Sequence, residues 1–433
     1  MNLLRKITSS KFFNLELFSF ILFIIVHVVL FNFNSAEWGD SYRILRASEF
    51  IRDGSYPSDE KRPPLFSAVL ALRPFSLDAV IWGRMVLFIF STLSFLLFYK
   101  LVKTYVKKEK YRFFALILFI FNPVYLYWSI RIMADVPFSF FVLLFFYIVA
   151  KWDDLNFFKI SLLGFVCGLS ILTRFEGYLL LGSGIILLLF QKEDLFKDKI
   201  KIKNILSVFF RNFKKVIPLL LTTLLVISPW LLYRNPLKSK YFDEAEKRVY
   251  DLKMVWTYLT SLIYVLGFTS AMSFIIIKFR IVKDFLLKNI GMFSFILFEL
   301  VLILLWPAAI PRLFVPLIPF FILILVMSVE SYMSDNGPNL THPRIIFIIS
   351  VLLTFFYLIS QYYLKLQFLV LGYKMLAVIF LVQIISLILL FTRKNTAYLF
   401  VIILSTVLWS FYAINMHRHI FKTITEASKY ASD

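Results

Sequence analysis

The sequence has almost no cysteine and little histidine, with one Cys and four His among 433 residues. The single cysteine, Cys167, lies in an apolar run, so an intrachain disulfide and a cysteine metal site are both excluded. The histidines are scattered, and the closest two, His417 and His419, stand in a segment typical of an ordinary basic tail. Metal or acid–base chemistry therefore depends on carboxylates. These are also scarce, because the sequence has 26 Asp and Glu residues against 47 Lys and Arg residues.

The net charge of +21 would suggest a nucleic-acid partner if the protein were soluble. The composition argues against that, because 60% of the residues are hydrophobic, 19% are aromatic and the mean hydropathy is +0.82. Most of the basic residues fall in loops on one side of the apolar runs, as the positive-inside rule requires. We therefore expect membrane lipids as partners and no nucleic acid.

Repeated apolar runs of membrane-spanning length predict an all-α polytopic membrane protein, since helices satisfy their own backbone hydrogen bonds in lipid. Neighbouring runs can be one broken helix, so we expect about 11–13 transmembrane helices. No separate soluble domain is expected, and the first run is predicted to be an uncleaved span, so residues 1–433 form one transmembrane domain. The runs are 12–33, 79–101, 112–129, 132–150, 157–172, 176–190, 215–233, 254–277, 289–308, 312–330, 344–364, 367–391 and 396–415.

Alternating these spans from a cytoplasmic N-terminus places the Lys- and Arg-rich segments 100–112, 192–215, 278–288 and 393–394 inside. The polar loop 34–78 then lies outside, so the predicted location is the plasma (inner) membrane with an extracytoplasmic site. Within this loop an amphipathic juxtamembrane helix is predicted, with Ile44, Ala47, Ser48 and Ile51 on one face and Arg46, Glu49 and Asp53 opposite. A solvated loop without chemistry is the alternative, and the periodicity does not separate the two.

Charged residues recur at the outer ends of other spans. They lie in the segments 128–137, 173–177, 233–234 and 306–312. Any one arginine here is explained by snorkelling at the interface, but together Asp40, Asp135 and Glu176 face the same side as Arg131, Arg174 and Arg312. Arginine forks suit phosphate oxygens, and a carboxylate at the water boundary can accept a proton from a hydroxyl nucleophile. Glu299 lies in mid-span and is assigned no role.

Three further segments have simpler interpretations. The connector Gln191–Lys215 is typical of a basic segment resting on anionic lipid, and Asn235–Lys253 is predicted to be an external surface helix that could cover the site. The sequon Asn339-Leu340-Thr341 falls on the predicted cytoplasmic side. No internal repeat is found, which argues mildly against an inverted-repeat transporter.

Several short motifs occur in a familiar order. They are Asp40 with Tyr42 and Ala47; Gly54-x-Tyr56-Pro57; Arg62-Pro63-Pro64-Leu65-Phe66; Asn122-Pro123; Ala134-Asp135-Val136-Pro137-Phe138; Gly164 with Gly168-Leu169-Ser170; Thr173-Arg174-Phe175-Glu176-Gly177; and Arg312-Leu313-Phe314-Val315-Pro316-Leu317-Ile318-Pro319. This order resembles the GT-C glycosyltransferases, in the branch related to protein O-mannosyltransferases and the lipid A aminoarabinose transferase. The resemblance covers about residues 12–330. Leu313 departs from the aromatic residue usual at its position.

The resemblance implies a catalytic base at Asp40, an assisting acidic residue at Asp135, and a lipid-phosphate site that includes Arg312 and Arg174. Shared sidedness adds Arg131 and Arg62 to the candidates for the donor phosphate. The candidates for acceptor contact or support are Glu37, Tyr42 and Glu176. Some relatives need a divalent metal. Because only carboxylates are available as ligands here, such a metal would be Mg²⁺ or Mn²⁺ held by Asp40 and Asp135.

The residues indicate transfer of a group from a lipid phosphate to an acceptor hydroxyl. The resemblance implies, more narrowly, an inverting glycosyltransferase that moves a sugar from an undecaprenyl- or dolichyl-phosphate donor to an acceptor hydroxyl of a glycan, lipid or protein. Residues 12–235 would form the core module with catalytic loop 34–78. Residues 236–433 would complete the donor groove, with spans 176–190 and 289–330 against the isoprenoid tail. A flippase or transporter for lipid-linked sugars and a non-enzymatic membrane assembly subunit remain alternatives, although a transporter should place its charges near the membrane midplane.

Overall fold

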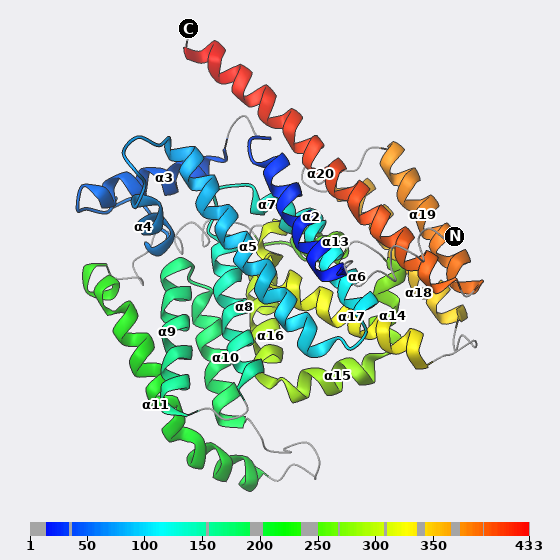
Figure 1. The fold of residues 1–433 in the computed structure, drawn as a ribbon, viewed down its shortest axis with the longest axis horizontal. Coiled ribbons are helices and arrows are strands. Elements are labelled where there is room, and N and C mark those ends of the chain that lie inside the picture. Colours follow the sequence, from blue (N-terminus) through cyan, green and yellow to red (C-terminus); the bar gives the residue numbers. More distant parts are fainter. Residues whose placement is uncertain are drawn as a thin grey trace.

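The computed structural model describes residues 14–33, 37–152, 156–190, 202–234, 250–266, 269–306, 310–335, 343–364, 373–392 and 394–432. Within these ranges all regular structure is helical, so the expected all-α bundle is confirmed (Figure 1). Most of the two predicted surface segments, 191–215 and 235–253, and the whole sequon at 339–341 lie outside the described residues or outside their described side chains.

The helices follow one another in a simple order along the chain. They are α2 (Leu15–Leu30), α3 (Gly39–Arg52), α4 (Leu65–Ala71), α5 (Ala79–Tyr105), α6 (Glu109–Ile120), α7 (Pro123–Ser129), α8 (Asp135–Lys151), α9 (Phe157–Thr173), α10 (Gly177–Phe190), α11 (Ile202–Tyr233), α13 (Leu252–Leu266), α14 (Thr269–Ile277), α15 (Phe279–Lys288), α16 (Ile290–Leu305), the 3₁₀ turn η2 (Pro311–Phe314), α17 (Ile318–Asp335), α18 (Pro343–Leu364), α19 (Tyr373–Phe391) and α20 (Asn395–Ser432).

Each predicted span contains at least one helix, but several are shorter or bent. Among the described residues, three helices alone are long and apolar enough to cross a membrane, or five if each of two bent pairs is one span. Span 112–129 is divided into α6 and α7, bent by 55°, because Pro123 has no amide hydrogen and Asn122 caps the new helix. Span 312–330 begins as the 3₁₀ turn η2 rather than as an α-helix, and Pro316 lies in the break before α17, whose first turn contains Pro319.

The juxtamembrane helix predicted in loop 34–78 is present as α3. Its predicted inner face is buried at Ile44, Ala47 and Ser48, and Ile51 is partly buried. The hydroxyl of Ser67, in α4, donates to the carbonyl of Ile44 at 3.2 Å, so the two short helices pack as one unit. Gly54, two residues after the end of α3, has φ +74°, a conformation that favours glycine after a helix C-terminus.

The long helix α11 packs closely on α9. A Cβ atom at Gly164 would lie 2.5 Å from the Leu219 carbonyl oxygen, so only glycine allows this approach. The hydroxyl of Thr223 donates to the Gly164 carbonyl oxygen at 3.0 Å across the same contact. Helix α9 is therefore fixed to α11 along its length, and its C-terminal end, which leads into the candidate site, is fixed with it.

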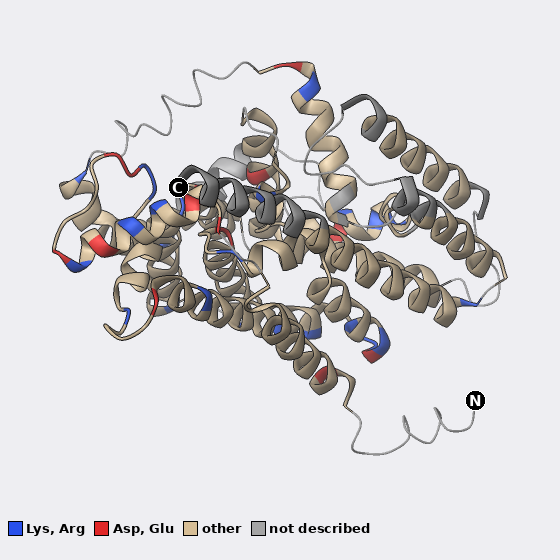
Figure 2. Cartoon of the chain, turned by 90° about the horizontal axis from the view of Figure 1, so that it is seen from above, with Lys and Arg blue, Asp and Glu red and all other residues tan. Residues whose placement is uncertain are grey.

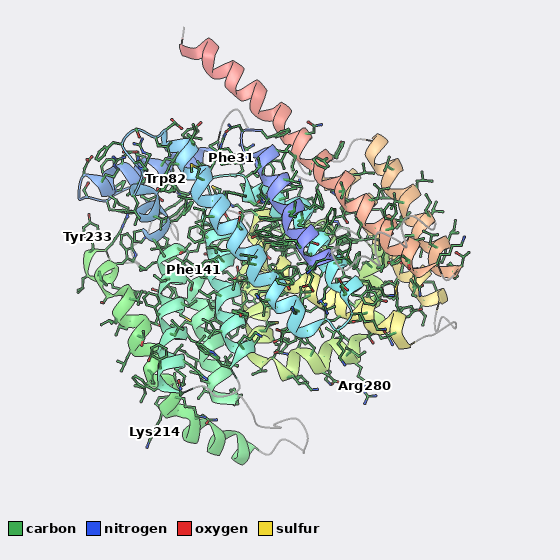
Figure 3. The ribbon with its side chains drawn as sticks, viewed as in Figure 1. Phe31, Trp82, Phe141, Lys214, Tyr233 and Arg280 are labelled. Atoms are coloured by element: carbon green, nitrogen blue, oxygen red, sulfur yellow. The ribbon has the colours of Figure 1, made fainter. Side chains whose placement is uncertain are left out.

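The two ends of the bundle differ in chemistry. Figure 1 shows α3 and α4 at one end and α15 at the other. Figure 3 shows Lys214 and Arg280 at the α15 end, whereas Tyr233, the last residue of α11, lies at the α3 end. Acidic and basic residues lie close together around α3, whereas long stretches of most other helices carry no charge (Figure 2). A dense group of charged side chains of both signs therefore lies at the α3 end of the bundle.

Candidate active site

Asp40 lies in the first turn of α3, where the helix dipole favours a carboxylate. Trp38, the N-cap residue of α3, holds the start of this helix in place. Its indole N–H donates to the Tyr127 hydroxyl at 3.1 Å, and its ring packs on Trp128. The side chain of Asp40 is 36% exposed, which leaves it accessible to solvent. Its position is thus set by α7, although it belongs to α3.

Arg62 contacts the first oxygen of this carboxylate. Its Nη2 lies 2.6 Å from Asp40 Oδ1, and its Nη1 lies 2.9 Å from Glu60 Oε1. Glu60 is buried, and the same oxygen also accepts the backbone N–H groups of Lys61 and Arg62, each at 3.0 Å. Glu60 therefore folds the loop back and points the Arg62 guanidinium at Asp40.

Arg312 contacts the second oxygen and reaches a second carboxylate. Its Nη1 lies 3.4 Å from Asp40 Oδ2, and its Nε lies 3.8 Å from Asp135 Oδ1. The guanidinium carbon lies 5.3 Å from the centre of the Trp128 ring. Because Trp128 also packs on Trp38, one indole aligns η2 with the start of α3. A single guanidinium thus joins residues that are far apart in the sequence.

Asp135 opens α8 and is almost fully buried, with 1% of its side chain exposed. Arg174 donates to Asp135 Oδ1 through one nitrogen and to Glu176 Oε1 through the other. The turn between α9 and α10 presents Arg174 and Glu176 as a pair. The network therefore runs from Arg62 through Asp40, Arg312, Asp135 and Arg174 to Glu176.

Gly177 makes this turn possible. The backbone of α10 begins directly against the end of α9, and a Cβ atom at Gly177 would lie 2.4 Å from the Ile171 amide nitrogen. Backbone atoms cannot yield as a flexible side chain can.

Gly177→Ala is accordingly expected to reduce the free energy of unfolding by about 1–3 kcal/mol, the usual range for overpacking. Gly182, also in α10, is the matched control, because its added Cβ would meet only the Phe298 ring edge at 3.5 Å. Thermal unfolding in detergent compares the two variants. Equal melting temperatures would contradict the close approach.

The charges of the site shift the pKa of two carboxyl groups. Burial raises the pKa of Asp40, but the neighbouring Arg62 and Arg312 outweigh burial and hold it below its usual value. Burial likewise raises the pKa of Glu176, and Arg174 outweighs it, so that pKa is also lowered. Both groups are therefore carboxylates at neutral pH, and Asp40 is a weak base while both guanidinium groups contact it.

Glu37, Arg131 and Tyr42 lie in a separate cluster. Glu37 is buried and pairs with Arg84, whose Nη2 lies 2.9 Å from Oε1, and its other oxygen accepts the Ile132 N–H at 3.3 Å. Arg131 is fully buried, and its guanidinium carbon lies 5.3 Å from the Tyr127 ring centre. The Tyr42 hydroxyl, on an exposed side chain, accepts the Glu37 N–H at 3.4 Å. These three residues brace the loops around the Asp40 network and are not joined to it by the contacts above.

Three residues that the sequence reasoning gave no role prove to support the site. Arg84 was concealed by its position within a long apolar span, where nothing in the sequence shows that its partner is Glu37. In the sequence alone, Glu60 is one of several charged residues of loop 34–78 and Arg234 is the single charge of segment 233–234, and nothing indicates their partners. A signal for Glu60 exists in its spacing, since a carboxylate two residues before an arginine can fold back on it.

The carboxylates do not form a metal cage. Among the described residues, no group of three or more His, Cys, Asp or Glu side chains is close enough to hold a metal ion. Asp40 and Asp135, the two predicted ligands, instead face guanidinium groups. Asp40 and Asp135 alone supply fewer carboxylates than such a group, so an Mg²⁺ or Mn²⁺ ion held by them would need its remaining oxygen ligands from substrate or water.

The network has unsatisfied polar atoms aimed into it. Asp135 Oδ2 and Arg312 Nε are both buried and have no hydrogen-bond partner. Buried polar atoms of this kind are rare unless a ligand or an ordered water completes them. The site thus combines an accessible carboxylate, Asp40, with an arginine, Arg312, whose Nε can still donate to an anion.

Comparison with solved structures identifies the fold. No protein-family model and no curated protein matches the sequence. The chain is similar to ArnT from Cupriavidus metallidurans bound to undecaprenyl phosphate, with a TM-score of 0.62 and 13% identity over 95% of this chain and 79% of that chain. The apo state of ArnT gives a TM-score of 0.58 and 14% identity, over 93% and 77% of the two chains.

A weaker likeness extends to the archaeal oligosaccharyltransferase AglB from Archaeoglobus fulgidus in complex with an inhibitory peptide and a dolichol-phosphate. Its TM-score is 0.48, with 12% identity over 81% of this chain and 55% of that chain. The likeness to ArnT establishes the bundle architecture, and the GT-C-like fold expected from the sequence motifs is confirmed.

Proposed function

We propose that this chain, which has the GT-C fold, is an inverting glycosyltransferase that moves a sugar from a polyprenyl-phosphate donor to an acceptor hydroxyl at the outer membrane face. The observation that carries the proposal is the bridge from Asp40 through Arg312 to Asp135. It places an accessible carboxylate beside guanidinium groups at one end of an apolar bundle. The fold that the chain shares with ArnT, a protein crystallised with undecaprenyl phosphate, supports the choice of donor class.

In this mechanism Asp40 accepts the proton of the acceptor hydroxyl. The hydroxyl oxygen attacks the anomeric carbon from the face opposite the phosphate, and the bond between that carbon and the phosphate oxygen breaks. The electron pair leaves with the polyprenyl phosphate, where Arg62 and Arg312 stabilise the negative charge that develops. Single in-line displacement inverts the anomeric centre.

The buried carboxylate Asp135 has a different task. It is almost inaccessible to an acceptor and pairs with Arg174, so we assign it the positioning of Arg312 and Arg174. Arg174 and Glu176 hold the far side of the network. Arg131, grouped with Glu37 and Arg84, is left out of the phosphate clamp.

The isoprenoid tail is proposed to lie along α16. Leu297, Val301 and Leu305 are exposed at one-turn spacing on this helix and form a stripe that runs toward the site end. Burial of the tail on such a surface contributes about 0.8 kcal/mol per CH₂ group. Helices α10 and α16 pack on each other through Gly182 and Gly291, so the tail is expected on their outer faces rather than between them.

Donor binding is also expected to activate the base. Without donor, Arg62 and Arg312 hold the pKa of Asp40 below its usual value. A phosphate oxygen that recruits the same guanidinium groups relieves this effect, and Asp40 becomes a stronger base only when the donor is in place. Premature deprotonation of an acceptor is thereby avoided.

Arg62→Gln is expected to move the acid limb of the kcat/KM profile to higher pH, by about one pKa unit. Asp40 acts as the carboxylate, so activity falls as pH drops through its pKa, and loss of the nearer arginine raises that pKa. Arg73→Gln, at a residue paired with Glu49 instead, should leave the limb in place. An unmoved limb in Arg62→Gln would rule out the electrostatic coupling to Asp40.

The proposed function is tested with the purified full chain in lipid nanodiscs. Undecaprenyl-phosphate-linked sugars of defined structure serve as donors and a delipidated cell-envelope extract serves as acceptor, and free undecaprenyl phosphate is quantified by mass spectrometry. Release that requires both the extract and Asp40 supports transfer. Movement of intact donor between leaflets without release would support the flippase alternative.

A further inference from the structure

Arg234, directly after the last residue of α11, reaches across to the loop that carries Arg62. Its Nη2 donates to the Ser58 carbonyl oxygen at 2.6 Å, and its Nη1 donates to the Pro57 carbonyl oxygen at 3.3 Å. The guanidinium carbon also lies 5.8 Å from the Tyr56 ring centre and 5.9 Å from the Trp230 ring centre. Tyr56 and Trp230 pack edge to face, with centroids 5.1 Å apart. One arginine thus holds both backbone and side chain of this loop.

The clasped loop leads directly to the candidate phosphate ligand. The Tyr56 hydroxyl donates to the Arg62 carbonyl oxygen at 2.9 Å, which closes the loop on its own far end. The Glu60 N–H donates to the Pro57 carbonyl oxygen at 3.2 Å, so the carbonyl held by Arg234 also sets the turn that carries Glu60. Glu60 in turn orients Arg62. The chain of contacts from Arg234 to Arg62 is therefore continuous.

The same helix supports the opposite side of the site. Helix α11 is fixed to α9 through Gly164 and Thr223, and α9 ends at the turn that presents Arg174. A displacement of α11 would move the supports of Arg174 and Arg62 together. The end of α11 is thus placed to set the distance between the two sides of the network.

We infer that Arg234 is a positioning residue. It holds loop 56–62 in the conformation in which the Arg62 guanidinium can contact both Asp40 and the donor phosphate. The inference rests on the proposed function, because it gives Arg234 its role through Arg62. Arg234 contacts neither Asp40 nor Arg312 in any contact above. Its effect should therefore appear only when Arg62 is present.

The experiment is a double-mutant cycle on the full chain in detergent, with undecaprenyl phosphate as the probe. Arg234→Ala is expected to weaken its affinity about tenfold, since a charge-assisted anchor is lost and Arg62 is no longer held in place. In the Arg62→Ala background the same change should have no further effect on the affinity. Arg234→Lys keeps one cationic donor for the Ser58 carbonyl and should fall between wild type and Arg234→Ala.

The pH profile supplies a readout that general destabilisation would not reproduce. If Arg62 drifts from Asp40, the acid limb of kcat/KM should move to higher pH in Arg234→Ala, as in Arg62→Gln. The matched control is Arg73→Ala, because Arg73 likewise donates to a loop carbonyl, that of Leu77, and pairs with a carboxylate at the same face. Arg73→Ala should leave both the affinity for undecaprenyl phosphate and the acid limb of kcat/KM unchanged.

Two results would overturn the inference about Arg234 and leave the proposed function intact. One is wild-type affinity in Arg234→Ala while Arg62→Ala binds weakly, and the other is fully additive losses in the double variant. If Arg62→Ala and Arg312→Ala both bind undecaprenyl phosphate as wild type does, the phosphate clamp fails and the inference fails with it. The two failures are thus distinguishable.

Discussion

Asp40→Asn is expected to lower turnover by about 10³-fold, the middle of the range for loss of a general base. The amide keeps the shape of the side chain but cannot accept the acceptor's proton. Affinity for undecaprenyl phosphate should rise at the same time, because Asp40 competes with the phosphate for Arg62 and Arg312. Slow turnover combined with tighter binding separates loss of the base from loss of the fold.

Turnover is measured as single-turnover release of undecaprenyl phosphate, and affinity by titration of the same preparation. Asp53→Asn, an isosteric change at the exposed C-terminal end of α3, is the matched control and should change neither quantity. Near-normal release by Asp40→Asn would remove Asp40 from the role of base. Weaker binding in that variant would instead show that the carboxylate supports the arginines rather than competing for them.

The sequence was sufficient to predict elements whose signal is local. The face of α3 follows from apolar residues at helical spacing, and Ile44, Ala47 and Ser48 are buried as that spacing predicts. The common sidedness of the charged turns follows from counting spans and applying the positive-inside rule. These inferences need only periodicity, length and charge, each of which can be read along one dimension.

Charge pairing could not be predicted in the same way. Arg131 and Arg174 occupy similar positions at outer turns, yet Arg174 meets Asp135 whereas Arg131 is buried in the cluster around Glu37. Which direction each guanidinium takes depends on how α5, α7 and α8 pack, and apolar helices carry little register information in their sequence. Arg234 is a similar case, since its partners are backbone carbonyls, which any residue could supply.

Arg312→Ala should weaken undecaprenyl phosphate binding about 10- to 100-fold, because a charge-assisted hydrogen bond contributes about 1.5–3 kcal/mol. Arg312 is well suited to this role: its guanidinium is held over Trp128, and its Nε is buried without a hydrogen-bond partner. An incoming phosphate oxygen can satisfy that nitrogen at little cost in side-chain order. Arg312→Lys keeps the charge but not the fork, so it should recover only part of the affinity.

The control for this variant is Arg280→Ala, which removes an exposed arginine at the opposite end of the bundle (Figure 3) and should leave the affinity unchanged. Removing Arg312 also leaves Asp40 with one fewer guanidinium and a higher pKa, so the acid limb of kcat/KM should move to higher pH. The loss of affinity and the shift of the acid limb have the same cause, because the Arg312 guanidinium interacts with both the donor phosphate and Asp40. An unchanged affinity with a shifted acid limb would show that Arg312 lowers the pKa of Asp40 without contacting the donor, and the phosphate clamp would then reduce to Arg62.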